Sequence, residues 1–317
     1  MIPGTYGEAE YTAHCRDLER MAHLYKNKKS SLPGKKSRAV RLLHSVRRGG
    51  LRDAIRQYRV LRSGVDQQLP VKDLENDAPD GNRNYFSRER IAVYTAEFGG
   101  YDEILEPVMR PDNIDYFIIT DGVLQPGSCW KPLNPSKCIP KQYREDPLLS
   151  NRWCKMHPHV LFPEYRYSVY IDANFLIVSD FTELVNRMGD FPAAMFRHKN
   201  RNCVYDEIKA CRIKNKAPHE ALRMHGALLK KHGVPKKYGL LEATVIVRRH
   251  RETRCIELME LWWQAFLKGC GRDQIALIDA LWEMGICPSA LGALGPNLDR
   301  CDLFIRMPHG NQRGRKT

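Results

Sequence analysis

The sequence predicts an α/β protein with one main domain, preceded by a basic and mainly helical segment. From about residue 87, β-like apolar runs alternate with helical patterns, whereas the stretch before it contains no such run and holds most of the excess positive charge. The chain has 317 residues, of which 43% are hydrophobic and 28% charged. This composition is sufficient for a buried core and excludes a wholly disordered or collagen-like protein.

The main domain, residues 87–317, is predicted from its order of strands and helices. The β-like runs are RIAVYTA, DYFIITD, YSVYIDANFLIV, AAMFRH and LLEATVIVRR, starting at residues 90, 115, 167, 193 and 240. Apolar residues recur at helical spacing most clearly in residues 253–267 and 272–282. We therefore expect a sheet with helices packed against it.

Residues 1–86 are predicted to form a separate basic segment. Between Arg16 and Arg62 there are 15 basic and 3 acidic residues, a net charge of +12 out of the +14 of the whole chain. Residues 38–48 and 51–62 have the spacing of amphipathic basic helices, and the stretch VKDLENDAPDGNRN has the composition of a linker. Such helices either dock on an anionic membrane surface or pack on the main domain. Nucleic acid is a less favoured partner, because only Tyr25 and Tyr58 interrupt the basic run.

The sequence also favours a cytoplasmic protein, with peripheral contact at the inner membrane face as one possibility. No stretch approaches the roughly 20 apolar residues of a membrane-spanning helix, and the first residues lack the pattern of a secretory signal. The ten cysteines include no Cys-x-x-Cys pair, and no acceptor site for N-glycosylation occurs. We expect reduced thiols and no zinc site of the Cys-x-x-Cys type.

A glycine pair follows the first predicted strand, in the run Glu97-Phe98-Gly99-Gly100-Tyr101-Asp102. Glycines at the carboxyl end of a buried strand are where α/β proteins admit a nucleotide. The alternative is an ordinary turn from a strand into a helix. Neither a G-x-G-x-x-G motif nor a phosphate-binding P-loop occurs, which disfavours a dinucleotide-binding enzyme or a P-loop kinase.

Two further patterns point to phosphate or metal chemistry. Asp172 and Asn174 end a predicted strand two residues apart, where a carboxylate and an amide oxygen on one face of an extended chain could bind one divalent cation. The alternative is a turn between two strands.

Arg152 and Lys155 lie at helical spacing in a stretch that we expect to begin at Asn151, and two cations there suit a diphosphate. The alternative is a solvated basic face.

The order of several motifs resembles a known family. The motifs are NRWCKMHPHVLFPEYRYSVYIDANFLIVSD, FRHKNRNCVYDE, GLLEATVIVRRH and GRDQIALIDAL. Together they are similar to a glycosyltransferase-like family first catalogued as a domain of unknown function, whose plant members include a cell-wall glycosyltransferase and a protein described as an alkaline ceramidase. The likeness covers residues 90–285, about 60% of the chain.

The resemblance implies a GT-A-like fold, a single Rossmann-like domain with a mixed central sheet that binds a nucleotide-sugar at the carboxyl ends of its strands. It places the donor, most naturally a UDP-sugar, against Thr95, Ala96, Tyr101, Asp121, Arg152, Lys155, Asp172, Ala173 and Asn174. It also implies Mn²⁺ or Mg²⁺ bound by Asp172 and Asn174, with His309 completing the set. The asparagine removes one carboxylate, which weakens a site that depends on anionic oxygen.

The same resemblance assigns an acceptor side and a base. His198, Arg201, Tyr205 and Glu207 would approach the sugar or the acceptor together with Gln274, the alternative for the first four being a charged surface loop. Asp273 and Glu242 are the two candidates for the base that removes the acceptor proton. Asp273 could instead only stabilise the first turn of its helix.

The function that these observations favour is transfer of a sugar from a nucleotide-diphosphate donor to a hydroxyl of a polysaccharide, glycolipid or other glycan. One alternative is a nucleic-acid-binding or membrane-surface-binding protein that uses residues 16–62. A lipid amide hydrolase is less favoured, because the sequence has neither a G-x-S-x-G nor an H-E-x-x-H motif.

Overall fold

A computed structural model describes residues 89–309 of the chain. The predictions for residues 1–86, including the two basic helices, the linker and a membrane or nucleic-acid contact, lie outside the described residues. No helix within residues 89–309 is long and apolar enough to cross a membrane.

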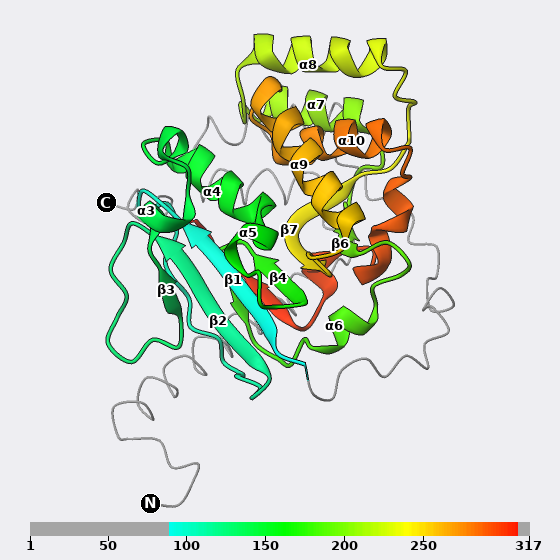
Figure 1. The fold of residues 1–317 in the computed structure, drawn as a ribbon. Coiled ribbons are helices and arrows are strands. Elements are labelled where there is room, and N and C mark those ends of the chain that lie inside the picture. Colours follow the sequence, from blue (N-terminus) through cyan, green and yellow to red (C-terminus); the bar gives the residue numbers. More distant parts are fainter. Residues whose placement is uncertain (1–88, 310–317) are drawn as a thin grey trace, which may run out of the picture. The chain divides into compact units, whose positions relative to one another are not determined.

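The described domain is built on a mixed six-stranded sheet in the order β3-β2-β1-β4-β7-β6 (Figure 1). Its strands are β1 (Ile91–Glu97), β2 (Ile114–Thr120), β3 (Lys131–Leu133), β4 (Tyr167–Ile171), β6 (Ala193–Arg197) and β7 (Leu241–Arg248). The four strands β3, β2, β1 and β4 run parallel, and β7 runs antiparallel to both of its neighbours. The predicted α/β fold with a mixed central sheet is therefore confirmed.

Helices and a small second sheet cover the two faces of the central sheet. The helices are α3 (Pro135–Cys138), α4 (Pro147–Met156), α5 (Pro158–Leu161), α6 (Glu183–Asn186), α7 (Val204–Ile213), α8 (His219–Lys231), α9 (Thr253–Lys268) and α10 (Asp273–Glu283). One apolar core joins the sheet to α4, α7, α8, α9 and α10. The other core contains α6 and the antiparallel pair β5 (Phe175–Ile177) and β8 (Phe304–Arg306).

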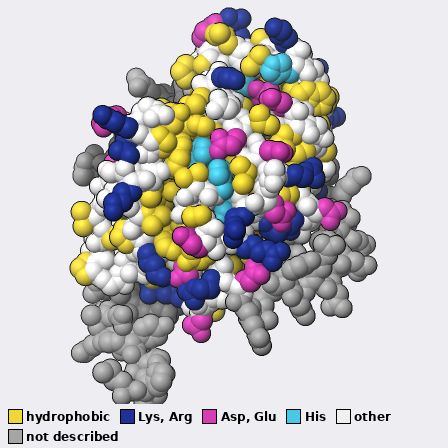
Figure 2. Space-filling model, viewed as in Figure 1, with side chains coloured by type: hydrophobic (Ala, Val, Ile, Leu, Met, Phe, Trp, Pro, Cys, Tyr) yellow, Lys and Arg dark blue, Asp and Glu magenta, His cyan; other side chains and the backbone are white. Residues whose placement is uncertain are grey.

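Figure 2 shows that acidic and basic side chains are mixed on the viewed face of the described domain, with no single basic surface.

Most predicted elements are present, with three differences. The predicted strand YSVYIDANFLIV is two strands, β4 and β5, separated by a turn in which the Phe175 amide donates to the Asp172 carbonyl at 3.0 Å. Strand β3 was not predicted, because KPL is short and mostly exposed. Helix α4 begins at Pro147, because Asp146 caps it by accepting hydrogen bonds from two backbone amides, 2.8 and 3.0 Å away.

The far end of α4 is held by a buried arginine on β7. Arg248 is fully buried, and its guanidinium donates to the Lys155 carbonyl at 2.7 Å and to the Tyr94 hydroxyl at 2.6 Å. The Tyr94 hydroxyl lies 3.2 Å from the carbonyls of Cys154 and Lys155, to which it can donate. These contacts satisfy carbonyls that a helix terminus leaves without intrahelical partners. They fix the backbone from which the Lys155 side chain extends.

The sheet topology collects polar side chains at one edge. Strands β1, β2, β4 and β6 end there, and the antiparallel strand β7 begins there. The polar residues at these strand ends are Glu97, Asp121, Asp172, His198 and Glu242. In open α/β sheets this carboxyl edge is where ligands bind.

Candidate active site

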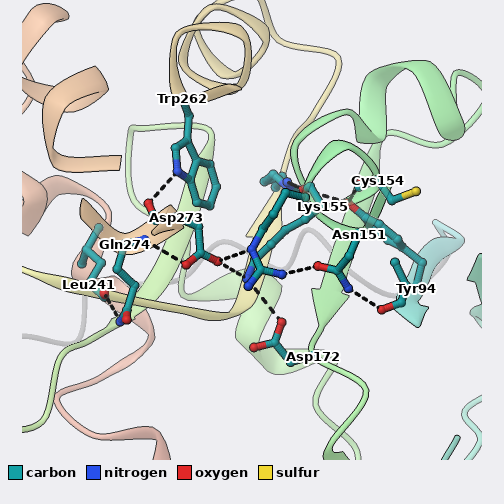
Figure 3. Close-up of polar contacts among 12 residues, drawn as sticks. Tyr94, Asn151, Cys154, Lys155, Asp172, Leu241, Trp262, Asp273 and Gln274 are labelled. Atoms are coloured by element: carbon teal, nitrogen blue, oxygen red, sulfur yellow. Dashed lines mark hydrogen bonds and ion pairs between the residues drawn. The ribbon is translucent and has the colours of Figure 1, made fainter. Parts of the chain in front are cut away.

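A buried lysine connects two carboxylates at the carboxyl edge of the sheet (Figure 3). The Lys155 Nζ atom lies 2.9 Å from Asp273 Oδ2 and 3.3 Å from Asp172 Oδ1. Only 2% of the Lys155 side chain and 6% of the Asp273 side chain is exposed, whereas 32% of the Asp172 side chain is. Asp172 is therefore the member of this trio that faces solvent.

Arg152 adds a second cation one helical turn before Lys155. Its Nε atom lies 3.1 Å from Asp273 Oδ2, and its guanidinium donates to the amide oxygen of Asn151. Asn151 in turn donates to the Ala96 carbonyl at 2.6 Å, which ties α4 to the end of β1. Because 19% of the Arg152 side chain is exposed, this cation is within reach of a bound anion.

Asp273 is the anchor of both cations. It is the first residue of α10, and its carbonyl accepts a 2.8 Å hydrogen bond from the Trp262 indole. Burial alone would raise the pKa of Asp273, but Arg152, Lys155 and Arg272 outweigh it and hold that pKa far below its usual range. An aspartate so stabilised as an anion is a weak proton acceptor, so the arrangement does not favour Asp273 as the base.

Asp172 and Asn174 do not share one face, contrary to the expectation for an extended chain. Both lie in the tight turn between β4 and β5, and their side chains have different partners. Asp172 faces Lys155, whereas the Asn174 amide nitrogen donates to the Met307 carbonyl at 3.2 Å. The turn was the alternative interpretation of this motif, and it is the local structure that forms.

His309 also has a protein partner. Its Nδ1 atom lies 2.8 Å from Asp102 Oδ1, and its ring lies 4.9 Å from the Tyr101 ring, measured between centroids. Asp172 faces an ammonium group through Oδ1, Asn174 directs its amide hydrogens at the Met307 carbonyl, and His309 faces Asp102, so these contacts do not gather the three side chains around one divalent cation. Within residues 89–309, no group of three or more His, Cys, Asp or Glu side chains could hold a metal ion.

The glycine pair forms a turn held by two carboxylates. Gly99 and Gly100 have φ angles of 71° and 60°, a left-handed conformation that glycine adopts without strain. Asp121 accepts from the Gly99 amide at 3.1 Å, and Glu97 accepts from the Tyr101 amide at 2.7 Å. The turn therefore presents Tyr101, which is 52% exposed, beside the end of β1.

The predicted donor residues of β1 and β4 meet beneath this turn. Thr95 lines a small pocket together with Asp172 and Ala173. The Thr95 hydroxyl is buried and has no hydrogen-bond partner in the described part of the chain. Ala96 contributes only its carbonyl, which accepts from Asn151.

Glu242 is the second residue of β7, the strand that neighbours β4 in the sheet. It is 5% exposed, and its Oε2 atom lies 3.4 Å from a guanidinium nitrogen of Arg306. Burial raises the pKa of Glu242, and Arg306 and Lys199 only partly offset this effect. Gln274 lies near the same strand, with its amide nitrogen donating to the Leu241 carbonyl at 3.1 Å. Of the two predicted base candidates, Glu242 has the more suitable environment.

Three of the five residues predicted on the acceptor side form one buried cluster. The Arg201 Nε atom donates to Glu207 Oε2 at 2.6 Å, and His198 Nδ1 accepts from the Arg201 backbone amide at 3.1 Å. Tyr205 lies apart from this cluster, because its hydroxyl donates to the Val234 carbonyl at 2.7 Å. The cluster follows β6 at the carboxyl edge and shapes the loop there.

The sequence assigned no individual role to Glu97, Asp102, Asn151 or Arg272. Glu97 ends an apolar strand just as Asp121 follows the next one, so the repeated pattern could have identified it. Asp102 and Asn151 carry no comparable signal, because their roles depend on contacts with His309 and Ala96 that only the fold creates, whereas Arg272 directly precedes Asp273 in the sequence.

Comparisons with known proteins bear on the same region of the chain. A family model described as TOD1/MUCI70, glycosyltransferase-like domain, matches residues 140–309. No curated protein sequence matches the chain.

Two solved structures have a similar arrangement. The galactosyltransferase LgtC, in complex with donor and acceptor sugar analogues, has 13% identity and a TM-score of 0.36, over 62% of this chain and 72% of that one. The bifunctional glycosyltransferase WbbM in its apo form has 12% identity and a TM-score of 0.38, over 79% of this chain and 46% of that one.

Proposed function

This chain belongs to the TOD1/MUCI70 family of glycosyltransferase-like domains, and we propose that it transfers a sugar from a nucleotide-diphosphate donor to an acceptor hydroxyl. Membership confirms the family resemblance drawn from the motifs, although the matched region, residues 140–309, lies further toward the C-terminus than the predicted 90–285. The donor class, the acceptor class and the roles of single residues are our proposals.

One observation carries the proposal: Arg152 and Lys155 are fixed by Asp273 beside Asp172 at the carboxyl end of β4. When the sugar leaves a nucleotide diphosphate, negative charge develops on the diphosphate oxygen. Cations that are already held in place stabilise that charge without reorganising, which lowers the barrier. Arg152, the more exposed of the two, would contact the diphosphate.

The nucleotide would lie along the ends of β1 and β2. Tyr101 offers an exposed ring for the base, and the Gly99–Gly100 turn lets the backbone approach closely. We retain a UDP-sugar as the first donor to test.

Glu242 would act as the base. The acceptor oxygen bonds to the anomeric carbon, the bond from that carbon to the diphosphate oxygen breaks, and the acceptor proton passes to Glu242. A carboxylate with a raised pKa is better suited to this task than one whose pKa is depressed. The acceptor, a glycan or a lipid-linked glycan, would enter beside the loop that His198, Arg201 and Glu207 hold.

Thermal unfolding in the presence of ligands tests the proposal. The full chain would be heated with UDP, GDP and a panel of their sugar conjugates, alongside the Arg152→Gln variant and an Arg223→Gln control. Arg223 is an exposed arginine paired with Glu220 on α8. A ligand at about 100 times its Kd stabilises a protein by about 2.7 kcal/mol. We expect one nucleotide class to raise the Tm of the wild type and the control but not of Arg152→Gln. No stabilisation by any member of the panel would contradict the proposal.

A membrane-bound acceptor would give the basic segment a role. We propose that residues 16–62, with a net charge of +12, hold the enzyme at an anionic lipid surface. Co-sedimentation of the full chain with phosphatidylserine vesicles at low and high salt tests this. Binding that salt removes supports the proposal, and binding to DNA but not to vesicles would contradict it.

A further inference from the structure

We propose that this enzyme binds the diphosphate of its donor without a divalent metal, because the Lys155 ammonium supplies positive charge where a metal would sit beside Asp172. The inference rests on the proposed function. Beyond that function, it specifies that a lysine side chain, and not a metal ion, supplies the positive charge at the donor site.

The lysine is built into the site. Its ammonium contacts Asp273 at 2.9 Å and Asp172 at 3.3 Å, and it lies 5.0 Å from the centre of the Tyr170 ring. Lys155 is only 1% exposed, so water does not screen its charge as it would on the surface. Its backbone is held by Arg248 through a 2.7 Å hydrogen bond to the carbonyl. A divalent ion bound to Asp172 would have to lie next to this fixed positive charge.

The other two residues expected to bind a metal, Asn174 and His309, have protein partners. Asn174 uses its amide hydrogens on the Met307 carbonyl, and His309 contacts Asp102 through Nδ1. These contacts connect the β4–β5 turn and the turn after β1 to the segment that follows β8. They hold these segments together without a metal.

The charge balance also favours an anion. Lys155, Arg152 and Arg272 act on Asp273, and Lys155 and Arg152 also act on Asp172. The further carboxylate near Arg272 is Glu207, which is paired with Arg201, so the cluster holds one more cation than carboxylate. The Nε atom of Arg272 is buried without a hydrogen-bond partner in the described part of the chain, whereas the Nε atom of Arg152 lies 3.1 Å from Asp273 Oδ2. A diphosphate would meet a net positive site, whereas a divalent cation would raise the local charge to +3.

The test compares nucleotide binding with and without metal in the wild-type full chain. The protein would be stripped with EDTA and heated with UDP or GDP, either in EDTA or in Mn²⁺, and Mn²⁺ binding to the protein alone would be followed by the EPR signal of the free ion. We expect the same Tm shift under both conditions and an undiminished signal of free Mn²⁺. A shift that appears only with Mn²⁺ overturns the inference and leaves the transferase function standing. No shift with either nucleotide under either condition overturns both.

A pair of lysine variants tests the role of Lys155 itself. Lys155→Met keeps the length of the side chain and removes its charge, and Lys131→Met does the same to a lysine paired with Asp115 at 2.6 Å, away from the carboxyl edge. We expect Lys155→Met to weaken UDP or GDP binding at least about tenfold in EDTA, because the site loses a fixed positive charge that water does not screen. Lys131→Met should bind as the wild type does. Equal binding by both variants overturns the role of Lys155, and if Lys155→Met does not fold, the wild-type comparison with EDTA and Mn²⁺ decides.

Discussion

The side chains of Lys155 and Asp273 meet at 2.9 Å although the two residues are 118 positions apart in the sequence. Lys155 lies near the end of α4 and Asp273 begins α10, so the pair joins the two helices beside the end of β4. Both side chains are almost completely buried. The proposed donor site therefore depends on packing between distant parts of the domain.

Removing the buried ammonium should destabilise the protein. Lys155→Met leaves Asp273 buried beside Arg152 and Arg272 without its ammonium partner, and breaking a buried ion pair typically costs about 3–5 kcal/mol. Urea unfolding would measure the difference in the free energy of unfolding. The Lys131→Met control, in which the lysine side chain is 61% exposed, should lose less than about 1 kcal/mol. Equal losses in the two variants would contradict the structural role of Lys155.

The contribution of Asp273 should depend on pH. Its pKa is lowered in the folded state, so its ionised form stabilises the fold; this stabilisation is complete above the unfolded pKa of about 3.9 and is lost as the pH falls toward the lower folded pKa. The stability difference between the wild type and Asp273→Asn should be constant from about pH 5 to pH 8 and shrink below about pH 4. Urea titrations at several pH values would measure it. A difference that grows on acidification would contradict this prediction.

Glu242→Gln should lower turnover more than it lowers stability. Loss of a general base typically costs about 10²–10⁴ in rate. Because burial raises the pKa of Glu242, activity of the wild type should fall with decreasing pH at a pH above the usual carboxylate pKa of about 4.3. The fold favours the neutral form of Glu242 over the ionised form. The neutral carboxyl therefore contributes to the stability of the fold below about pH 4.3, and this contribution is lost as the pH rises through the pKa of Glu242 in the folded protein. We would measure kcat as a function of pH. We expect the fall in kcat at low pH in the wild type and its absence in Glu242→Gln.

Asn174→Asp, which restores a second carboxylate, should not create a metal site. The new oxygen would face the Met307 carbonyl that now accepts a 3.2 Å hydrogen bond, and we expect a loss of about 1–3 kcal/mol. Asn134→Asp is the matched control, because Asn134 accepts from the Ser136 amide through its oxygen, which aspartate retains. Thermal unfolding with and without Mn²⁺ would measure both. Stabilisation of Asn174→Asp by Mn²⁺ would contradict the account.

The turn that leads into Asp273 should tolerate no side chain at Gly269. A Cβ atom there would lie 2.6 Å from the His225 ring and 2.7 Å from the Ala265 carbonyl oxygen. We expect Gly269→Ala to cost about 1–3 kcal/mol and to weaken nucleotide binding through displacement of α10. Gly189→Ala, which meets no atom within 4 Å, should change stability by less than about 1 kcal/mol. Matched urea curves for the two variants would decide the prediction.

The sheet was predictable because its strands carry a strong local signal. β1 is buried along its whole length and β4 has the predicted bounds, Tyr167–Ile171, because continuous apolar runs report burial on both faces. β3 escaped prediction because an exposed KPL segment forms a strand only through its pairing with β2.

The residues of the candidate site could be predicted from the sequence, but most of the contacts between them could not. Arg152, Lys155, Asp172 and Asp273 were all identified as candidates, and the fold brings them together. Their pairing could not be derived from sequence, because it depends on α10 returning to α4 after more than one hundred residues. The depressed pKa of Asp273, which weakens its candidacy as the base, follows from that pairing alone.

The most direct test of the central claim is release of nucleoside diphosphate from a panel of UDP- and GDP-sugars by the wild type and by Arg152→Gln, with water taking the sugar in place of the acceptor hydroxyl. We predict that the wild type releases the diphosphate from donors of one nucleotide class, and that Arg152→Gln does so about 10²–10³ times more slowly, as expected when a group that stabilises transition-state charge is removed. Release at equal rates by the two proteins, or none from any donor by the folded wild type, would contradict the account.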